Sequence, residues 1–394
     1  MKQVAIVDFG STKIQCILAS AGREGTLQIE GQVAERHSGL KKNHQPNIVL
    51  IQKSTLDAME ELEKQTRTDI GPVCIGVPGL YSKAICCRAK AYYETPHILQ
   101  EEDMQELTRK SLEDTQRQQM ILLHSIPVYY ILDGEKYYEL PERKAAQSIE
   151  IIFSHVFMMR EFRELVHTVL DGSKYKVLRF VASTFAQALY VIPEEALARD
   201  AILVDVGGYE TNVCIMRSHA PVFHQTFPIG GEHLSNDLKY VTKMNSENAE
   251  IIKKRYIFGL AYDEGNENVR LENGRLMAVP NQLIQDIMEA RAAEMIIMIA
   301  NYISESPIDL AEGTSISLTG GGLAPIRGSV EFFQKFVGFP VRSQTPVINH
   351  IPAPFGVSSA LGVAQYVLAD EEELGKPTWK ERSFFKKLLH FFME

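Results

Sequence analysis

The feature that most constrains the fold is a set of three glycine-containing turns, each of which follows a short apolar run. The turns are DFGSTK at residues 8–13, DVGGYET at residues 205–211 and TGGG at residues 319–322. In the first two, an aspartate ends the apolar run and a glycine stands two residues later. Such runs are typical of buried strands, and glycine lets the backbone turn tightly and approach a ligand closely. The pattern therefore predicts buried strands that end in ligand-binding turns.

Two aspartate turns that face one another would grip a polyphosphate from both sides. Asp8 and Asp205 would hold hydrated Mg²⁺, because carboxylates are the ligands that this cation prefers. Backbone amides and hydroxyls of the turns would donate hydrogen bonds to the phosphate oxygens. The predicted donors are Gly10, Ser11, Thr12, Gly207 and Gly208. The predicted ligand is Mg-ATP.

The composition is that of a globular protein. The 394 residues are 45% hydrophobic and 23% charged, which suffices for two or three cores. The net charge of −9 argues against nucleic acid as a partner, because that partner requires a basic surface. The five cysteines are odd in number and lack metal-ligand spacing, so we expect reduced thiols in a cytosolic protein. No apolar run approaches the roughly 20 residues of a transmembrane helix, and the N-terminal run is too short for a signal peptide.

The three turns resemble the two phosphate motifs and the adenosine motif of the actin, Hsp70 and sugar-kinase superfamily. PIGGEHLSNDL at residues 228–238 and AEIIKKRYIFGLA at residues 249–261 are similar to segments of the FtsA family of bacterial division proteins. The resemblance runs over nearly the whole chain, although only these segments are specific. It implies an α/β fold of the actin-like type, which is a duplicated ribonuclease H-like ATPase fold, with a small inserted α+β domain of the SHS2 type.

The resemblance also implies an adenosine side of the site. Gly320, Gly321 and Gly322 would pass beneath the adenosine and the α-phosphate, where side chains would clash. The alternative is an ordinary strand-to-helix turn. Glu250 and Lys253 stand at i and i+3 of a predicted helix, one face of which FtsA-like proteins turn towards the ribose and base. Here the alternative is a solvated ion pair.

Other positions of the implied site are less regular. Gly230 in the PIGG segment belongs to it, and Lys13 either pairs with a phosphate or caps its strand. Tyr209 and Glu210 replace the third glycine and the threonine of the usual DxGGGT, so either the loop is reshaped or binding is weakened. Ala182 stands where the superfamily can carry a water-activating carboxylate. We therefore expect slow hydrolysis or none, assign no catalytic residue, and expect ATP to act as a structural ligand.

Local patterns predict the secondary structure. In IPVYYILDGEKYYEL at residues 126–140, the DG pair between two aromatic runs predicts a hairpin. The other predicted strands are at residues 4–7, 13–19, 27–33, 72–79, 201–204 and 315–318, and the predicted helices are at residues 54–67, 101–120, 246–256 and 281–302.

The predicted domains follow the actin-like plan. Subdomain IA comprises residues 1–82, 161–205 and 355–368, and the insert, subdomain IC, comprises residues 83–160. Subdomain IIA comprises residues 206–231 and 307–354, and subdomain IIB comprises residues 232–306. An acidic linker at residues 369–378 precedes the C-terminal tail.

The tail, WKERSFFKKLLHFFME at residues 379–394, predicts a basic amphipathic helix. At 100° per residue its large apolar side chains share one face, and lysines lie opposite. This pattern is typical of a helix that lies on an anionic membrane surface. The predicted membrane residues are Phe384, Phe385, Lys386, Lys387, Leu388, Leu389, Phe391 and Phe392. The alternative is a helix that docks on the protein itself or on a partner.

The resemblance implies a peripheral protein on the cytoplasmic face of the membrane at the division septum. It would bind ATP, polymerise head to tail and recruit the tubulin-like protein FtsZ, whose C-terminal tail would dock on residues 232–306. Other division proteins would contact residues 83–160.

Three other proteins with this fold are alternatives. PilM of type IV pilus assembly also has an insert and binds a short peptide, but its pattern does not predict a separate basic tail. A sugar kinase would need a catalytic aspartate and a sugar pocket, for which the sequence offers no clear candidate. An Hsp70-type chaperone would need a β domain after the ATPase, and only the linker and tail remain.

Overall fold

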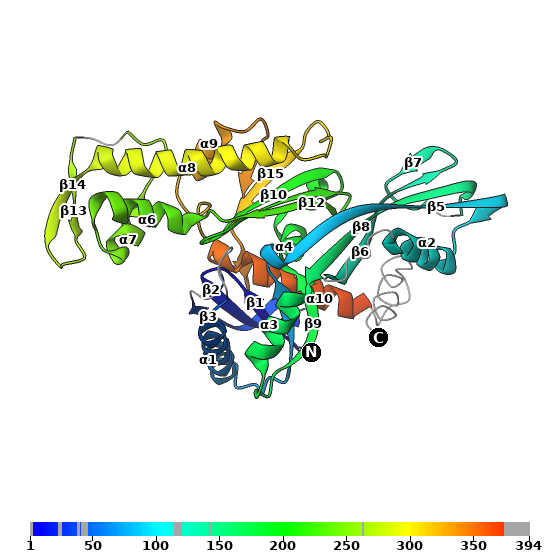
Figure 1. Cartoon of the computed structure of the whole chain (residues 1–394), viewed down its shortest axis with the longest axis horizontal. Helices are drawn as coiled ribbons and strands as arrows, with labels where there is room; N and C mark the ends of the chain where they lie inside the picture. Colours follow the sequence, from blue (N-terminus) through cyan, green and yellow to red (C-terminus); the bar gives the residue numbers. More distant parts are fainter. Residues whose placement is uncertain are drawn as a thin grey trace.

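The computed structural model describes residues 3–22, 26–37, 40, 46–113, 120–141, 143–261 and 264–373 of the chain. It is an α/β protein with two five-stranded sheets and a four-stranded sheet at one end (Figure 1). No helix among these residues is long and apolar enough to cross a lipid bilayer. The predicted membrane residues lie outside the described residues, namely Phe384, Phe385, Lys386, Lys387, Leu388, Leu389, Phe391 and Phe392.

The first half is built on a sheet with the strand order β3-β2-β1-β4-β9. Its strands are β1 (Gln3–Phe9), β2 (Lys13–Ala21), β3 (Leu27–Arg36), β4 (Pro72–Val77) and β9 (Lys176–Ala182). β1 to β3 form the predicted antiparallel meander, and β4 and β9 run parallel to β1. Parallel neighbours need long crossovers, which contain helices. The helices of this half are α1 (Ile48–Thr66), α3 (Arg160–Leu170), α4 (Ser183–Val191) and α10 (Ser358–Glu373).

Side chains alternate along β1 and so enter two different cores. Ala5 and Val7 belong to the core that α1 and α3 cover. Val4 and Ile6 belong to the core on the opposite face, which α10 covers (Figure 1). Asp8 continues this second row, so its carboxylate lies on the α10 side at the end of the strand.

The second half repeats the same topology. Its sheet has the order β12-β11-β10-β15-β16, in which β10, like β1, pairs antiparallel on one side and parallel on the other. The strands are β10 (Asp200–Val206), β11 (Thr211–Arg217), β12 (Ala220–Phe227), β15 (Ser315–Thr319) and β16 (Val341–Ser343). The duplicated, actin-like α/β fold predicted from the sequence is thereby confirmed.

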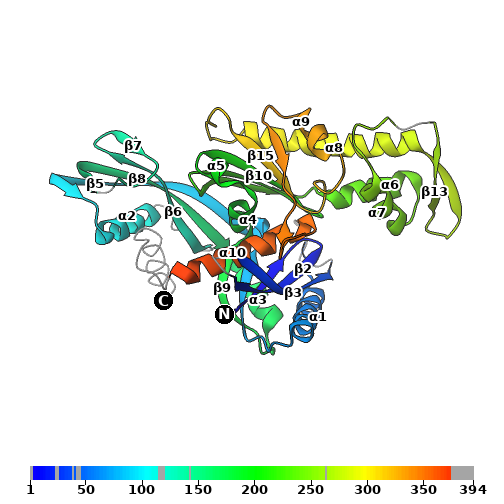
Figure 2. The same cartoon turned by 180° about the vertical axis from the view of Figure 1, so that it is seen from behind.

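Helices of the second half extend away from this sheet. They surround a core with apolar side chains such as Leu234, Met288 and Ile296. Figure 2 shows this group at one end of the molecule and the four-stranded sheet at the other. The elements of this group are α6 (Gly231–Thr242), α7 (Ser246–Arg255), β13 (Asn266–Arg270), β14 (Leu276–Pro280) and α8 (Asn281–Ser304). A further helix, α9 (Ser329–Gln334), packs against β16 of the sheet.

The four-stranded sheet has the order β5-β8-β6-β7 and is inserted between β4 and α3. The predicted hairpin is confirmed, because Asp133 and Gly134 connect β6 to β7 with φ values of 50° and 88°. Positive φ at both positions is typical of the turn that DG sequences form. The elements are β5 (Ser82–Ile98), α2 (Glu101–Glu113), β6 (Met120–Leu132), β7 (Glu135–Tyr137) and β8 (Ala145–Met159).

Three predicted boundaries are wrong. The first helix begins at Ile48, not residue 54, because the side chain of Asn47 accepts a hydrogen bond from the Leu50 amide and caps it. Met120 opens strand β6, where it pairs with Met159, and does not end the helix before it. α10 continues to Glu373, since the acidic residues of the predicted linker are adequate helix formers and no glycine interrupts them.

A hairpin of the second half packs on the first half, and α4 and α10 pack together within the first half. A short hairpin of the second half reaches the edge of the first sheet, where the Asn349 side chain accepts from the Ile29 amide (3.0 Å) and donates to the Ile29 carbonyl (2.8 Å). α4 and α10 cross closely at Gly362, where a Cβ would lie 2.6 Å from the carbonyl oxygen of Ala186. The remaining elements are η2 (Gly79–Tyr81), α5 (Glu194–Leu197), β17 (Val347–Ile348), β18 (Ile351–Pro352) and η3 (Phe355–Val357).

Candidate nucleotide site

The first predicted phosphate turn is a tight loop between β1 and β2. The amide of Gly10 donates to the carbonyl of Lys13 at 3.0 Å. From the end of β3, the His37 ring contacts the carbonyl of Gly10 at 2.8 Å and the His37 amide donates to the carbonyl of Thr12 at 2.9 Å. The turn is therefore fixed on both sides before any ligand binds.

The second predicted phosphate turn has the same construction. The amide of Gly207 donates to the carbonyl of Glu210 at 2.8 Å, as Gly10 does to Lys13. The start of α6 rests on this turn, because the amide of Gly231 donates to the carbonyl of Gly207 at 2.9 Å. A Cβ at Gly230 would lie 2.5 Å from the carbonyl oxygen of Gly208, so this approach requires glycine.

The three turns, far apart in the sequence, converge in space. The amide of Tyr209 donates to the hydroxyl of Ser11 at 3.2 Å, and a Cβ at Gly208 would overlap the side chain of Thr12. The glycine turn joins the second phosphate turn, because the amide of Gly322 donates to the carbonyl of Val206 at 2.7 Å. The structure thus places the predicted phosphate and adenosine donors around one point.

Asp8 is buried at this point, and Asp205 is half-buried. Burial raises the pKa of Asp8 above its ordinary value, and the hydroxyl of Ser183, which donates to Asp8 Oδ1 at 2.6 Å, opposes that rise. Burial raises the pKa of Asp205 to about 6, and repulsion from Asp8 adds to the rise. Hydrogen bonds from Asn212 and Gln187 act against it. Two desolvated carboxylates that repel each other favour a cation between them.

Lys13 points into the site. Its ammonium packs against Gly356, where a Cβ would lie 2.7 Å from Nζ. Burial lowers the pKa of Lys13, and attraction to Asp8 and Asp205 opposes this effect. Of the two roles that the sequence left open, the position of Nζ favours the phosphate over a cap on the solvent side of the strand.

Sequence reasoning missed a further acceptor, Gln15. It stands opposite Asp8 in the β1–β2 ladder, so both side chains leave the sheet on the same face. Its Nε2 donates to the carbonyl of Gly356 at 3.4 Å, while its Oε1 is buried without a hydrogen-bond partner among the described residues. A buried acceptor beside two carboxylates fits hydrated Mg²⁺, whose waters would donate to it.

The other missed residues follow from register and helix spacing. Asn212 faces Asp205 across the β10–β11 ladder, as Gln15 faces Asp8. Ser183 and Gln187 are four residues apart on α4, so they share one face of that helix. Ser183 donates to Asp8, and Gln187 donates to the hydroxyl of Ser358 at 2.8 Å. Only the spacing of seven residues between each aspartate and its partner was visible in the sequence.

The predicted pair on α7 is not solvated. Lys253 is 5% exposed, and its Nζ lies 2.6 Å from Glu250 Oε2 and 3.2 Å from the carbonyl oxygen of Gly231. Ser235 donates to the same carboxylate at 2.9 Å. A Cβ at Gly231 would overlap Gly322, so the pair lies next to the glycine turn. The alternative of a solvent-exposed ion pair is therefore wrong for Lys253.

Of the two departures from the family pattern, Glu210 is buried and Tyr209 is half-buried against α6. The Tyr209 ring meets the ring of His233 on α6 edge-on, with centroids 6.0 Å apart. Glu210 is 8% exposed, and its charge contributes to raising the pKa of Tyr81 after the effect of burial. The turn keeps its tight shape despite both replacements, because that shape depends on the backbone bond from Gly207.

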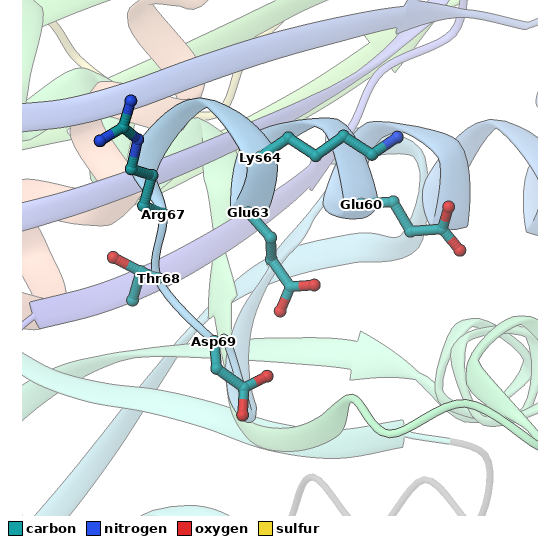
Figure 3. Close-up of a pocket in the computed structure, with 6 residues that line it drawn as sticks. All are labelled: Glu60, Glu63, Lys64, Arg67, Thr68 and Asp69. Carbon is teal, nitrogen blue, oxygen red and sulfur yellow. The ribbon is translucent and has the colours of Figure 1, made fainter.

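A shallow depression of about 390 Å³ lies elsewhere, at the C-terminal end of α1 (Figure 3). None of its lining residues belongs to the three turns. Two of them, Glu63 and Asp69, pair with Lys174 at 2.7 and 2.5 Å. These ion pairs satisfy the carboxylates, so the depression offers no comparable chemistry. It is lined by Glu60, Glu63, Lys64, Arg67, Thr68 and Asp69.

Known proteins resemble this chain in sequence and in fold. Residues 202–362 match the family described as cell division protein FtsA. The chain is 21% identical over 349 residues to the cell division protein FtsA of Pseudomonas aeruginosa, covering 88% of this chain and 83% of that protein. The predicted resemblance is thereby confirmed.

Two solved structures share the fold. A chain of the PilM-PilN type IV pilus biogenesis complex has a TM-score of 0.64 at 14% identity, covering 93% of this chain and 98% of that chain. MreB5 of Spiroplasma citri, solved with ADP bound, has a TM-score of 0.55 at 11% identity, and the match covers 95% of this chain and 99% of that chain. At these identities the similarity establishes the fold alone.

Two neighbouring glycines should respond differently to alanine. Gly320 has a φ of 89°, and a Cβ there would overlap Asp205 Oδ1. We expect Gly320→Ala to lower the free energy of unfolding by about 1–3 kcal/mol. Gly321→Ala is the matched control, because its Cβ would meet only Gly356, at 3.6 Å from Cα and 3.9 Å from the amide nitrogen. Urea denaturation measures both, and equal losses would contradict the crowding of the glycine turn.

Ionising Asp205 should destabilise the protein when no cation is present. Its pKa in the folded state, about 6, exceeds its ordinary value of 3.8, so the contribution of Asp205 to the free energy of unfolding is fully present below pH 3.8 and is lost as the pH rises through 6. We expect wild type to lose up to about 3 kcal/mol relative to Asp205→Asn between pH 4 and 7. If the free energies of unfolding of wild type and Asp205→Asn changed in parallel with pH in metal-free buffer, this prediction would be refuted. Added Mg²⁺ should reduce the difference in the free energy of unfolding between wild type and Asp205→Asn.

Proposed function

Because this chain is a relative of the FtsA cell division proteins, we propose that it is an ATP-binding, actin-like protein that tethers FtsZ filaments to the cytoplasmic face of the membrane at the septum. The observation that carries the nucleotide part is the meeting of two aspartate turns and a glycine turn at one point. The membrane part rests on the sequence of the tail. Each part has its own experiment.

In this proposal Asp8, Asp205 and Gln15 hold hydrated Mg²⁺, whose charge neutralises phosphate. Lys13 and the turn amides bind the phosphates. The glycine turn, with Glu250 and Lys253 of α7 behind it, faces the adenosine. A nucleotide held in this way relieves the repulsion between two desolvated carboxylates. The ADP bound to MreB5, which shares the fold, supports this assignment.

We propose that ATP acts as a structural ligand and is hydrolysed slowly or not at all. Ala182, at the end of β9, carries no group that could accept a proton from water. A bound nucleotide contacts both halves, so it stabilises one arrangement of the halves over others. Head-to-tail polymerisation would depend on that arrangement. The proposed subdomains are those that the sequence predicts, with the nucleotide between the halves.

The tail is the proposed membrane anchor. Residues 379–394 would lie on the anionic surface with the phenylalanines and leucines inserted and the lysines facing headgroups. One such helix binds reversibly. A polymer that presents many copies binds firmly, because each bound tail raises the effective concentration of the next.

The proposed site for the FtsZ C-terminal tail is the surface of α6 and α7. Tyr240 is 78% exposed there, and Val241 and Ile251 are also exposed. Lys243 lies over the Tyr240 ring at 4.5 Å, which places a positive charge beside the apolar surface. Exposed apolar side chains with neighbouring cations suit a peptide that carries both apolar and acidic residues. In this proposal, other division proteins contact the four-stranded insert.

The alternative is a component of type IV pilus assembly that resembles PilM and binds a partner peptide. It is favoured by the TM-score of 0.64 with the PilM-PilN complex. The two proposals differ in the tail. Only the division protein requires residues 379–394 to bind membrane, so lipid binding discriminates between them.

We expect the full chain to pellet with vesicles of phosphatidylglycerol and phosphatidylethanolamine, and a chain that ends at Pro377 to remain in the supernatant. Mg-ATP should increase pelleting, because it would promote assembly. Leu388→Glu places a charge on the apolar face of the tail and should abolish pelleting. Ser383→Glu is the matched control, since the same charge falls on the polar face. If the truncated chain pellets equally, the anchor is elsewhere and the pilus alternative gains support.

Tyr240→Ala should weaken binding of a synthetic FtsZ C-terminal peptide about fivefold or more, because large aromatic side chains dominate such interfaces. Fluorescence anisotropy with labelled peptide measures the affinity. Tyr92→Ala, a change at a tyrosine of β5 that is 75% exposed, is the matched control and should bind the peptide normally. Equal affinity for wild type and Tyr240→Ala would remove α6 from the proposed interface.

A further inference from the structure

A buried histidine of the insert reaches the first half. His124 lies on β6 and is 1% exposed. Its ring packs between Phe185 of α4 and Tyr366 of α10, with ring centroids 5.2 and 5.1 Å away. The ring therefore stands where the inserted sheet, α4 and α10 meet.

Both nitrogens of His124 are engaged by the first half. The amide of Ala182 donates to Nε2 at 3.1 Å, so Nε2 is unprotonated. A neutral imidazole with one accepting nitrogen has its proton on the other, so Nδ1 donates to the hydroxyl oxygen of Tyr366 at 3.1 Å. Burial, and then the charge of Arg179, lower the pKa of His124 to about 3, which keeps the ring in this form.

The bond to Ala182 fixes the start of α4. Ala182 ends β9 and directly precedes this helix, and its own side chain provides no cap. The next residue, Ser183, donates its hydroxyl to Asp8 at 2.6 Å. The amide that His124 holds and the hydroxyl that donates to the candidate magnesium carboxylate thus belong to consecutive residues.

Tyr366 connects the same ring to the second half. It belongs to α10, whose first residue, Ser358, accepts a hydrogen bond from Gln187 of α4 at 2.8 Å and contacts the hydroxyl of Thr319 at 3.2 Å. Thr319 is the last residue of β15, directly before the glycine turn. His124 is therefore linked to elements on both sides of the site.

We propose that His124 is a positioning residue: by holding the amide of Ala182 it sets the Ser183 hydroxyl on Asp8, and it thereby couples the packing of the insert to the affinity of the site for Mg-ATP. This inference rests on the proposed nucleotide binding. A partner that shifts the inserted sheet would then change nucleotide affinity without touching the nucleotide.

The test is a double-mutant cycle on the full chain, with Mg-ATP affinity measured by calorimetry. His124→Phe and Ser183→Ala should each raise the Kd about threefold to tenfold, the effect of one lost hydrogen bond. Both substitutions act through Asp8. The Kd of the double variant for Mg-ATP should therefore be no higher than the higher of the two Kd values of His124→Phe and Ser183→Ala. His124→Gln keeps an acceptor for the Ala182 amide and should restore most of the affinity.

His155 supplies the matched control. It is equally buried, on β8 of the same sheet, but its ring nitrogens contact Ser111 and Ser125 within the insert at 2.8 and 3.0 Å. His155→Phe should lower the melting temperature and leave the Kd unchanged, and its effect should be additive with that of Ser183→Ala.

The outcomes separate the two proposals. If wild type fails to bind Mg-ATP, the proposed function and this inference both fail. If wild type binds and folded His124→Phe binds equally well, or its effect is additive with Ser183→Ala, the inference alone is overturned. Should His124→Phe not fold, His124→Gln decides: it keeps an acceptor for the Ala182 amide, so an affinity as low as that of Ser183→Ala would overturn the inference, and near wild-type affinity would support it.

Discussion

The desolvation of two carboxylates, buried Asp8 and half-buried Asp205, explains most of the polar architecture of this protein. Each lies at the end of a central strand, in a place where its ionised form is costly. The fold supplies each with polar neighbours, chiefly Ser183 for Asp8 and Asn212 for Asp205, yet burial still dominates both pKa values. A protein that retains such a pair gains from a cation, and this requirement makes the site a candidate for a metal-bound polyphosphate.

The glycines follow from the same geometry. Two hairpin turns and a third loop can meet around one point only if their backbones nearly touch. A Cβ at Gly208 would overlap Thr12, and one at Gly322 would overlap the carbonyl of Gly207. The three turns can therefore converge only because glycine, which has no side chain, occupies these positions. The Tyr209–Glu210 departure is tolerated because both side chains point away from these backbone contacts and pack elsewhere.

α4 has a central position in this arrangement. One face of the helix serves Asp8 through Ser183 and α10 through Gln187, and its N-terminus is held by a histidine of the insert. Three other parts of the chain therefore meet on a helix of nine residues. A short helix that is buried along most of its length transmits a displacement better than a loop would, because its closely packed side chains leave little free volume to absorb the displacement.

Local sequence patterns suffice to predict the strands, the phosphate turns and the Asp133–Gly134 hairpin of the insert, because alternation, glycine and aspartate act over a few neighbouring residues. The sequence also determined the amphipathic character of the tail. Only the tertiary structure decided that Gln15 faces Asp8, that Lys253 is buried, that Met120 belongs to a strand, and that His124 reaches Ala182. The physical reason is distance along the chain: Ser183 and Asp8 are 175 residues apart, and no local preference encodes a contact between them.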